Sequence, residues 1–317
     1  MPRAAAVDCG TNSVRLLVTD LDPVTGAQVD LDRQMRVVRL GEGVDATGRL
    51  SDAALARTFA AVEDYARTVS ELGAERVRFV ATSASRDAEN AADFVTGIRE
   101  RLGVDPQVVA GGEEAELSFL GATRELAGVV PGPYCVVDIG GGSTEVVVGD
   151  VVDGVPTVQA SRSVDVGCVR MTERHLLADP PTPEQVAAAR ADVEAALDEV
   201  ERSVDLSGVR TLVGLAGSVT TMAGEALGLA AYEPERIHGS VHTVDDLLAA
   251  SQRLLTASRQ ERAARGFMHP GRVDVIGAGG LVWQGCLERV RLRSGLQQAR
   301  VSEHDILDGI AWSLVRS

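Results

Sequence analysis

The stretch VDCGTNSVRLLV at residues 7–18 has a counterpart in VDIGGGSTEVVV at residues 137–148. The two segments align position by position without a gap, with Asp8 matching Asp138. In each segment an apolar run ends in Asp-x-Gly, a small polar loop follows, and a second apolar run leads to a turn-rich stretch. This pattern is typical of a β-hairpin. Because the same hairpin recurs at a long interval, the sequence predicts two domains of similar construction.

The segments between and after the two hairpins alternate between strand and helix patterns. Residues 52–72 and 113–126 carry apolar side chains at helical spacing, and a short apolar run lies between them. Alternation of this kind predicts an α/β fold. We expect an N-terminal domain over residues 1–127 and a C-terminal domain over residues 128–317, with a last helix at about 303–317 that packs back on the first domain.

Composition and charge exclude several classes of protein. The 317 residues include 31 basic side chains, all of them arginine, and 46 acidic ones, which gives a net charge of −15. A chain without lysine cannot use a Schiff-base lysine or the lysine of a nucleotide-binding P-loop. The acidity also argues against a nonspecific nucleic-acid binder, which needs a broad basic surface. A polyanionic ligand must therefore be held by local clusters of donors.

The N-terminal sequence and the cysteines predict a cytoplasmic protein. The carboxylate of Asp8 precedes any apolar run of signal-peptide length. The longest uncharged stretch, residues 211–224, is shorter than the roughly 20 apolar residues of a membrane-spanning helix. The four cysteines lie far apart without a C-x-x-C pair, as is usual in a reducing compartment.

The loop of each hairpin offers backbone N–H groups and hydroxyls in a concave arrangement that binds phosphate oxygens without lysine. A single Asp-Gly turn often closes a hairpin for structural reasons alone. Two copies in the same register favour a function, and we expect the pair of loops to clamp a phosphate chain. The candidate residues are Asp8, Gly10, Thr11, Asn12 and Ser13 in the first loop and Gly140, Gly141, Gly142, Ser143 and Thr144 in the second.

At one aligned position the two hairpins carry opposite charges, because Arg15 corresponds to Glu145. Arg15 offers a guanidinium fork for phosphate oxygens. Glu145, together with Asp138, is suited to magnesium, which needs only one or two protein carboxylates besides waters and substrate phosphates. The alternative is that Arg15 and Glu145 are a solvated pair on the hairpins.

Other positions have both a functional and a structural interpretation. Glu114 lies in the first turn of the helix predicted over 113–126, either as a catalytic carboxylate or as an acidic residue favoured by the helix dipole. Arg86 follows a predicted strand, where α/β proteins bind ligands, or it is a surface arginine. Residues 214–220 form a second strand-to-helix glycine turn. The five histidines show no metal-ligand spacing on a common helix, and we expect none of them to bind a metal.

Four motifs together resemble the exopolyphosphatase and guanosine-pentaphosphate phosphatase (Ppx/GppA) family. They are AVDCGTNSVR at residues 6–15, ATSASRDAEN at 81–90, GEEA at 112–115 and DIGGGSTE at 138–145. Weaker matches, which extend the resemblance over nearly the whole chain, lie at residues 214–217, 271–276 and 302–309. Because the sequence ends at Ser317, we expect it to lack the C-terminal helical domains of longer members, and it resembles most the short, two-domain members.

The resemblance implies both a fold and a set of roles. The family belongs to the actin, hexokinase and acetate-kinase superfold, which implies two actin-like (ribonuclease-H-like) domains with an interdomain cleft. It implies that Glu114 is the general base that activates water and that magnesium is held by Asp138 and Glu145. A requirement for a monovalent cation such as K⁺ is left open. Arg86 and Arg272 would hold the next phosphates, and the short members imply a cytosolic homodimer.

We expect an exopolyphosphatase that hydrolyses terminal phosphoanhydride bonds of inorganic polyphosphate, with no nucleic-acid or membrane partner. A guanosine pentaphosphate 5′-phosphohydrolase needs the same core and remains open. Two further alternatives are a kinase of this superfold and a non-enzymatic scaffold. The kinase would need an adenosine pocket near residues 214–224, and the scaffold would not depend on Glu114. The candidate walls for a long polyanion, or else solvated helix faces, are Arg259, Arg262, Arg265, Arg289, Arg291 and Arg293.

Overall fold

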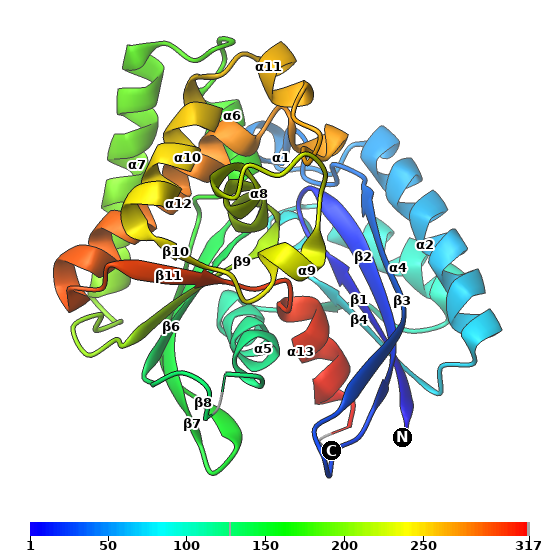
Figure 1. Ribbon diagram of the computed structural model, residues 1–317. Helices are drawn as coiled ribbons and strands as arrows, with labels where there is room; N and C mark the ends of the chain where they lie inside the picture. Colours follow the sequence, from blue (N-terminus) through cyan, green and yellow to red (C-terminus); the bar gives the residue numbers. More distant parts are fainter. Residues whose placement is uncertain (127, 316–317) are drawn as a thin grey trace. The chain divides into compact units, whose positions relative to one another are not determined.

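The computed structural model describes residues 1–126 and 128–315 (Figure 1). Each half of the chain forms one mixed β-sheet with helices, so the predicted α/β class is confirmed. The domain boundary predicted after Ala127 and the last two residues of the predicted C-terminal helix lie outside the described residues.

The chain divides into two compact units. The first unit comprises residues 1–121 and the C-terminal segment that begins at Ile306, and the second comprises residues 122–305. The C-terminal segment therefore belongs to the first unit, although it follows the second unit in sequence.

The sheet of the first unit is built from five strands. They are β1 (Arg3–Cys9), β2 (Ser13–Leu21), β3 (Gln28–Val37), β4 (Arg76–Ala81) and β5 (Gln107–Val108). Their order in the sheet is β3-β2-β1-β4-β5. Strand β1 pairs antiparallel with β2 and parallel with β4, and β4 pairs parallel with β5.

The sheet of the second unit repeats this arrangement and adds one edge strand. Its strands are β6 (Tyr134–Ile139), β7 (Thr144–Val152), β8 (Val155–Val164), β9 (Thr211–Leu215), β10 (Val241–Thr243) and β11 (Gln298–Val301). Their order is β10-β11-β9-β6-β7-β8. Strand β6 pairs antiparallel with β7 and parallel with β9, which in turn pairs parallel with β11. Strands β6, β7, β8, β9 and β11 thus correspond to β1, β2, β3, β4 and β5.

The two predicted hairpins are confirmed, and their registers are equivalent. In the first hairpin Asp8 lies directly opposite Arg15, and in the second Asp138 lies directly opposite Glu145. The next strand pair of each unit also has an irregularity at the same aligned position, after Val18 where β2 pairs with β3 and after Val148 where β7 pairs with β8. The duplication seen in the sequence therefore extends to the details of strand pairing.

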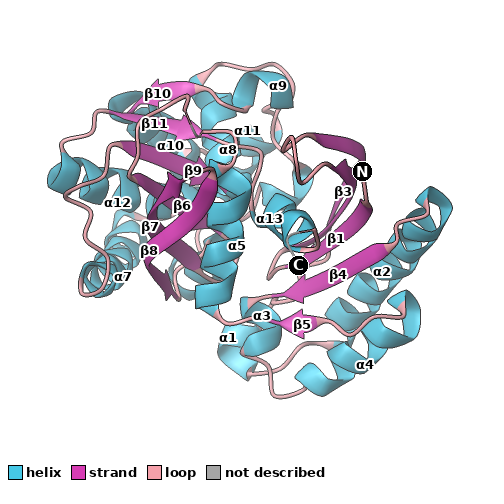
Figure 2. Ribbon diagram, turned by 90° about the horizontal axis from the view of Figure 1, so that it is seen from below, coloured by secondary structure: helices cyan, strands magenta, loops and turns pink. Residues whose placement is uncertain are grey.

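Helices cover both faces of the first sheet. They are α1 (Val44–Thr47), α2 (Asp52–Leu72), α3 (Ser83–Arg86), α4 (Ala91–Leu102), α5 (Gly111–Thr123) and α13 (Ile306–Ser313). Because successive residues of a strand face opposite sides, Ala5 and Val7 pack in the core with α2 and α4, whereas Ala4 and Ala6 pack with α5 and α13. Figure 2 shows α2 and α4 side by side next to β4.

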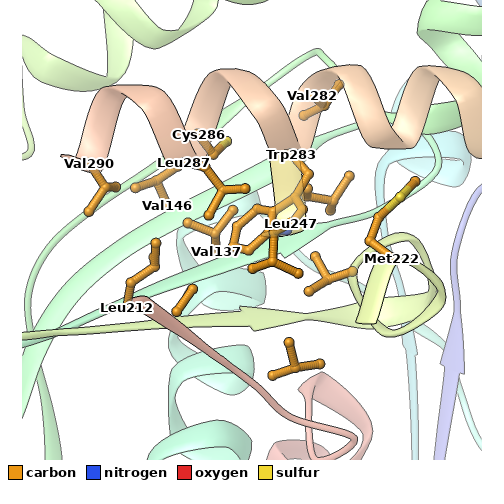
Figure 3. Close-up of a cluster of buried hydrophobic side chains, with 14 of the residues drawn as sticks. Val137, Val146, Leu212, Met222, Leu247, Val282, Trp283, Cys286, Leu287 and Val290 are labelled. Atoms are coloured by element: carbon orange, nitrogen blue, oxygen red, sulfur yellow. The ribbon is translucent and has the colours of Figure 1, made fainter. Parts of the chain in front are cut away.

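The core of the second unit is centred on α12. Its helices are α6 (Cys168–His175), α7 (Pro183–Glu201), α8 (Ala216–Ala226), α9 (Pro234–Ile237), α10 (Val244–Thr256), α11 (Arg259–Ala263) and α12 (Ile276–Ser294), with a 3-10 turn at Pro270–Arg272. Figure 3 shows Trp283, Leu287 and Val290 of α12 pointing toward Val137 and Leu212 of the sheet. Within the described part of the chain, no helix combines the length and the apolar character that crossing a membrane requires.

Helix α13 packs closely against the rest of the first unit. Asp308 is buried and accepts hydrogen bonds from Arg33 Nη2 (2.5 Å) and Gln28 Nε2 (2.9 Å). One residue later, Gly309 lies so near α5 that a Cβ atom there would overlap the carbonyl oxygen of Leu117. The absence of a side chain at Gly309 therefore allows α13 to reach its place.

We predict that Gly309→Ala lowers the free energy of unfolding by about 1–3 kcal/mol, because the added methyl group must push backbone away from backbone. Chemical denaturation with a thermal melt measures the effect. Gly208→Ala is the matched control, since a Cβ atom there meets nothing within 4 Å. Equal destabilisation by the two substitutions would show that the close contact at α13 is unimportant.

Candidate active site

The predicted site residues of the first unit lie at one edge of its sheet. Strands β1, β4 and β5 are parallel, so their carboxyl ends meet at this edge. The segments that follow them are the loop at 10–13, the segment 82–86 and the segment 109–114. The edge at the carboxyl ends of parallel strands is where open α/β sheets bind ligands. The fold therefore places the first loop, Arg86 and Glu114 on the same side of the unit.

The first loop is held in one conformation by its neighbours. Thr11 Oγ1 lies 2.9 Å from Ser83 Oγ in a buried hydrogen bond, which joins the loop to the segment after β4. The N–H of Gly41 donates to the carbonyl of Thr11 at 2.9 Å. A Cβ atom at position 41 would overlap the methyl group of Thr11, so only glycine allows this approach. The loop is consequently preorganised before any ligand arrives.

The second loop is braced in a related way by the start of α6. The N–H groups of Cys168 and Val169 donate to the carbonyls of Gly140 and Gly141 at 3.0 and 2.8 Å. Gly167, just before the helix, lies so close that a Cβ atom would come within 2.5 Å of the Gly141 carbonyl group. In both units the loop carbonyls thus accept hydrogen bonds from backbone N–H groups of the same unit.

Each loop has two backbone N–H groups without a hydrogen-bond partner among residues 1–126 and 128–315. In the first loop they belong to Thr11 and Asn12, and in the second to Gly141 and Gly142. These four positions are equivalent in the alignment of the two hairpins. Adjacent backbone donors in a tight turn form a concave site for an anion. The structure therefore offers one anion-binding turn in each unit.

Several of the predicted phosphate ligands instead have structural partners. The N–H groups of Gly10 and Gly140 close their own turns by donating to the carbonyls of Ser13 and Ser143, both at 3.0 Å. The hydroxyl of Thr144 donates to a backbone carbonyl of the segment before α6. Gly10, Gly140 and Thr144 therefore have a structural role, and their contact with phosphate stays a prediction.

Arg15 also has a partner that the sequence did not predict. Its Nε and Nη2 atoms lie 3.0 and 2.7 Å from one oxygen of Asp8, which faces it across the hairpin. Asp8 itself is buried. Two of the donors predicted to bind phosphate are therefore occupied by Asp8, and Arg15 fixes the position of that carboxylate. The solvated-pair alternative does not describe Arg15.

Glu114 and Arg86 form an ion pair at the edge of the first sheet. Arg86 Nη1 lies 3.0 Å from the carbonyl oxygen of Val109 and 3.4 Å from Glu114 Oε2. Glu114 is only 8% exposed. Its neighbour Glu113 has a side chain 48% exposed, which binds Arg78 instead. The structure thus separates two adjacent carboxylates, one enclosed beside an arginine and one at the surface.

The carboxylates predicted to bind metal lie at the corresponding edge of the second sheet. Asp138 and Glu145 face each other across β6 and β7, and they are 6% and 1% exposed. Ser163 on β8 continues the row and donates its hydroxyl to Glu145 Oε1 at 2.7 Å. Residues opposite each other in an antiparallel pair have their side chains on the same face, close together. The burial of Glu145 rules out the solvated alternative for this residue.

This pair of carboxylates fits a hard divalent cation. Two buried negative charges on one face repel each other unless a positive charge or a proton compensates them. Carboxylate oxygens are the ligands that Mg²⁺ prefers, and it commonly takes only one or two of them from the protein. Asp138 and Glu145 are thus suited to hold Mg²⁺.

The glycine turn at 214–220 and Arg272 come together in the second unit. Arg272 lies over Gly217, where a Cβ atom would overlap the guanidinium group, and its Nη1 is 3.2 Å from Thr221 Oγ1. Ala216, at the junction of β9 and α8, has a φ of 64°, which is rarely adopted by a residue with a side chain. Such strain is concentrated at functional sites. The turn and Arg272 therefore form a second candidate anion site in this unit.

Sequence reasoning missed two residues beside this turn. The hydroxyl of Tyr232 donates to Glu303 Oε1 at 2.6 Å and lies 2.9 Å from Thr220 Oγ1. Burial raises the pKa of Tyr232 to about 12, so the phenol keeps its proton at neutral pH. Glu303 lies in one of the weaker motif matches, which was the only signal for it in the sequence.

The six arginines proposed as walls for a polyanion are engaged with carboxylates. Arg262 is buried against Asp179, and Arg289 contacts Glu194 and Glu201. The other four also form ion pairs with acidic side chains of the second unit, namely Arg259 with Asp274, Arg265 with Glu225, Arg291 with Asp245 and Arg293 with Glu201. These pairs neutralise the positive charge, so the structure does not support a basic track at these positions.

Known proteins are similar to this chain over most or nearly all of its length. The chain matches the sequence model of the Ppx/GppA phosphatase family over residues 22–314. It is 49% identical to exopolyphosphatase 2 of Mycobacterium tuberculosis over 321 aligned positions, which cover 99% of each chain. A guanosine-5′-triphosphate,3′-diphosphate pyrophosphatase of Photobacterium profundum is 32% identical over 70% of this chain and 43% of its own length. The solved structure of a protein described as exopolyphosphatase-like has a TM-score of 0.94 and 42% identity, and covers 99% of both chains.

We predict that Ser163→Ala lowers the free energy of unfolding by about 1.5–3 kcal/mol, because the buried carboxylate of Glu145 loses a hydrogen bond made to a charged group. Urea denaturation measures the change. Ser161→Ala is the matched control on the same strand, and we expect its effect to stay within about 0.5 kcal/mol. If Ser163→Ala proves as mild as the control, the hydroxyl does not support the carboxylate pair.

Proposed function

Because the chain belongs to the Ppx/GppA phosphatase family, we propose that it is an exopolyphosphatase, which hydrolyses the terminal phosphoanhydride bond of inorganic polyphosphate and releases orthophosphate. The observation that carries the proposal is the full-length similarity to a relative named exopolyphosphatase 2. The local geometry of each unit agrees with this activity, because it supplies an enclosed carboxylate, unpartnered N–H donors in tight turns, and guanidinium groups.

In the proposed reaction Glu114 is the general base. Its carboxylate takes a proton from a water molecule, whose oxygen then attacks the terminal phosphorus in line with the bond to the rest of the chain. The new P–O bond forms as the anhydride P–O bond breaks, and the shortened polyphosphate leaves. Arg86 positions the base by holding Glu114 Oε2 at 3.4 Å, and its remaining donors are suited to phosphate oxygens.

The chain's backbone donors have the second role in this proposal. We assign the N–H groups of Thr11, Asn12, Gly141 and Gly142 to phosphate oxygens, because they are preorganised by the braces on each loop. Arg272 is assigned to a phosphate farther along the chain. Positioning and charge stabilisation of this kind account for most of the catalysis of phosphoryl transfer.

Asp138 and Glu145 have the third role, as ligands of Mg²⁺. When bound, Mg²⁺ would supply positive charge for phosphate oxygens and for the developing charge of the leaving group. Ser163 holds Glu145 from the adjacent strand, and the register of the hairpin sets Asp138 opposite it. Both side chains are thereby oriented without help from a ligand.

A guanosine pentaphosphate 5′-phosphohydrolase is the second candidate function. One relative is named for the hydrolysis of this kind of nucleotide, and its alignment covers 70% of this chain. Both substrates end in a phosphoanhydride and need the same base and donors, so comparison of their kcat/KM values distinguishes the two. The homodimer and a K⁺ requirement belong to the same proposal, and light scattering and a K⁺ titration test them.

We predict that Glu114→Gln lowers kcat for phosphate release from polyphosphate by about 10²–10⁴-fold, because the amide cannot accept the proton of the attacking water. Phosphate release in the presence of Mg²⁺ is the measurement. Glu113→Gln is the matched control, since it removes a neighbouring carboxylate that faces the surface, and we expect nearly full activity. Equal losses in the two variants would remove Glu114 as the base.

We predict that Asp138→Asn and Glu145→Gln each raise the Mg²⁺ concentration for half-maximal activity by about tenfold or more, because each removes a charged ligand. Isothermal titration calorimetry with Mg²⁺ gives an independent measure of Mg²⁺ binding. Asp153→Asn serves as control, as it removes an exposed carboxylate from the turn between β7 and β8. Unchanged Mg²⁺ binding in both variants would place the cation elsewhere.

A further inference from the structure

Three potential metal ligands from distant segments meet in the second unit. Glu125 follows α5, His238 follows α9, and His304 follows β11. Figure 1 shows the end of β11 next to α9, and the N–H of Gly239 joins them by donating to the carbonyl of Val301 at 2.8 Å. The expectation that no histidine takes part in a metal cluster relied on spacing along one helix, and the fold brings these two together from separate loops.

The distances in this cluster suit a small tetrahedral ion. Glu125 Oε2 lies 3.2 Å from His238 Nε2, and Glu125 Oε1 lies 3.3 Å from His304 Nδ1. All three ligand atoms are within 4.8 Å of one another. A tetrahedral ion with bonds of about 2.0–2.1 Å separates neighbouring ligands by roughly 3.3 Å. The two nitrogens lie near different oxygens of Glu125, so a small movement of the rings is needed to bring both nitrogens to about this distance from the one oxygen that binds the ion.

We propose that Glu125, His238 and His304 form a binding site for a divalent transition-metal ion of the Zn²⁺ class, with water as the fourth ligand. Two imidazoles with one carboxylate select such ions over Mg²⁺, which favours oxygen ligands alone. All three side chains are partly exposed, so an ion reaches them directly from solvent. The site is distinct from Asp138 and Glu145 and goes beyond the proposed phosphatase activity.

The surroundings of the cluster prepare it for a cation. Hydrogen bonds from His238 and His304 hold the pKa of Glu125 well below its usual range, so this group is a carboxylate at neutral pH. The backbone of His304 is fixed by Ser302, whose hydroxyl donates to the His304 carbonyl at 2.9 Å and accepts from its N–H at 3.0 Å. The two imidazole rings lie with their centroids 4.5 Å apart.

Metal binding at His238 requires a change of tautomer. Nδ1 of His238 accepts the N–H of Glu303 at 3.2 Å, so Nε2 carries the proton that it donates to Glu125. Coordination through Nε2 needs the lone pair of that nitrogen, so the proton moves to Nδ1, which then no longer accepts the N–H of Glu303. The hydrogen bonds that both histidines donate to Glu125, and the one that His238 accepts from Glu303, are thus exchanged for coordinate bonds. The side chain of Glu303 accepts a hydrogen bond from Tyr232, whose hydroxyl also lies next to Thr220.

The test is a titration of tag-free protein with Co²⁺, in excess Mg²⁺ to occupy oxygen-ligand sites, followed by competition with Zn²⁺. Bound in a tetrahedral nitrogen and oxygen site, Co²⁺ gives intense visible absorption, whereas octahedral oxygen ligation gives only weak bands. We expect one equivalent of intense signal, which Zn²⁺ removes. Glu125→Gln and His304→Asn should each weaken Co²⁺ binding at least tenfold.

His175→Asn is the matched control, because His175 also pairs with a carboxylate, Asp192 at 2.9 Å, without a second histidine. Its Co²⁺ titration should equal that of the wild type. Thermal melts verify that every variant is folded. Because Glu125 is exposed, we expect Glu125→Gln to fold, and this variant still tests the proposal if His304→Asn unfolds. The proposal is overturned if the wild type shows only weak octahedral bands, or if the intense signal survives in Glu125→Gln and His304→Asn.

Discussion

The hydrogen bond that closes each Asp-x-Gly turn is the constraint on which both candidate sites depend. It runs from the first glycine to the serine carbonyl, at 3.0 Å in each unit, and it fixes how the two strands of the hairpin pair. A slip of one residue would turn every side chain of a strand to the opposite face of the sheet. Asp138 and Glu145 would then no longer share a face, and Arg15 would leave Asp8.

The same turns explain how a protein of net charge −15 would bind the polyanion that we propose as its substrate. Guanidinium groups are present at the sheet edges, but the two in the first unit are paired with carboxylates, Arg15 with Asp8 and Arg86 with Glu114. Backbone N–H groups carry no formal charge and need no counter-ion in the empty site. Donors of this kind let an acidic chain without lysine hold phosphate oxygens at fixed points and leave the remaining surface acidic.

The sequence predicted those features that arise from local pattern or repetition. The hairpins, the α/β class and the positions of Glu114 and Glu145 at strand or helix ends follow from periodicity and from the repeat of the hairpin sequence. Contacts between distant segments have no such signal. The pairing of Arg15 with Asp8 depends on strand register, and the meeting of His238 with His304 depends on how two loops of the second unit are placed. A glycine such as Gly309 is informative only when its neighbour is known.

The two adjacent glutamates at the start of α5 show why burial carries more weight than residue type. The helix dipole favours acidic residues in the first turn, and it favours Glu113 and Glu114 equally. It explains why carboxylates occur there, but it gives no reason to enclose one of them. Burial of a charge costs several kcal/mol unless a partner compensates it. Glu114 is enclosed and compensated by Arg86, whereas Glu113 stays at the surface beside Arg78. Stability alone would be served by two exposed carboxylates, so the enclosed one is better explained by the chemistry proposed for it.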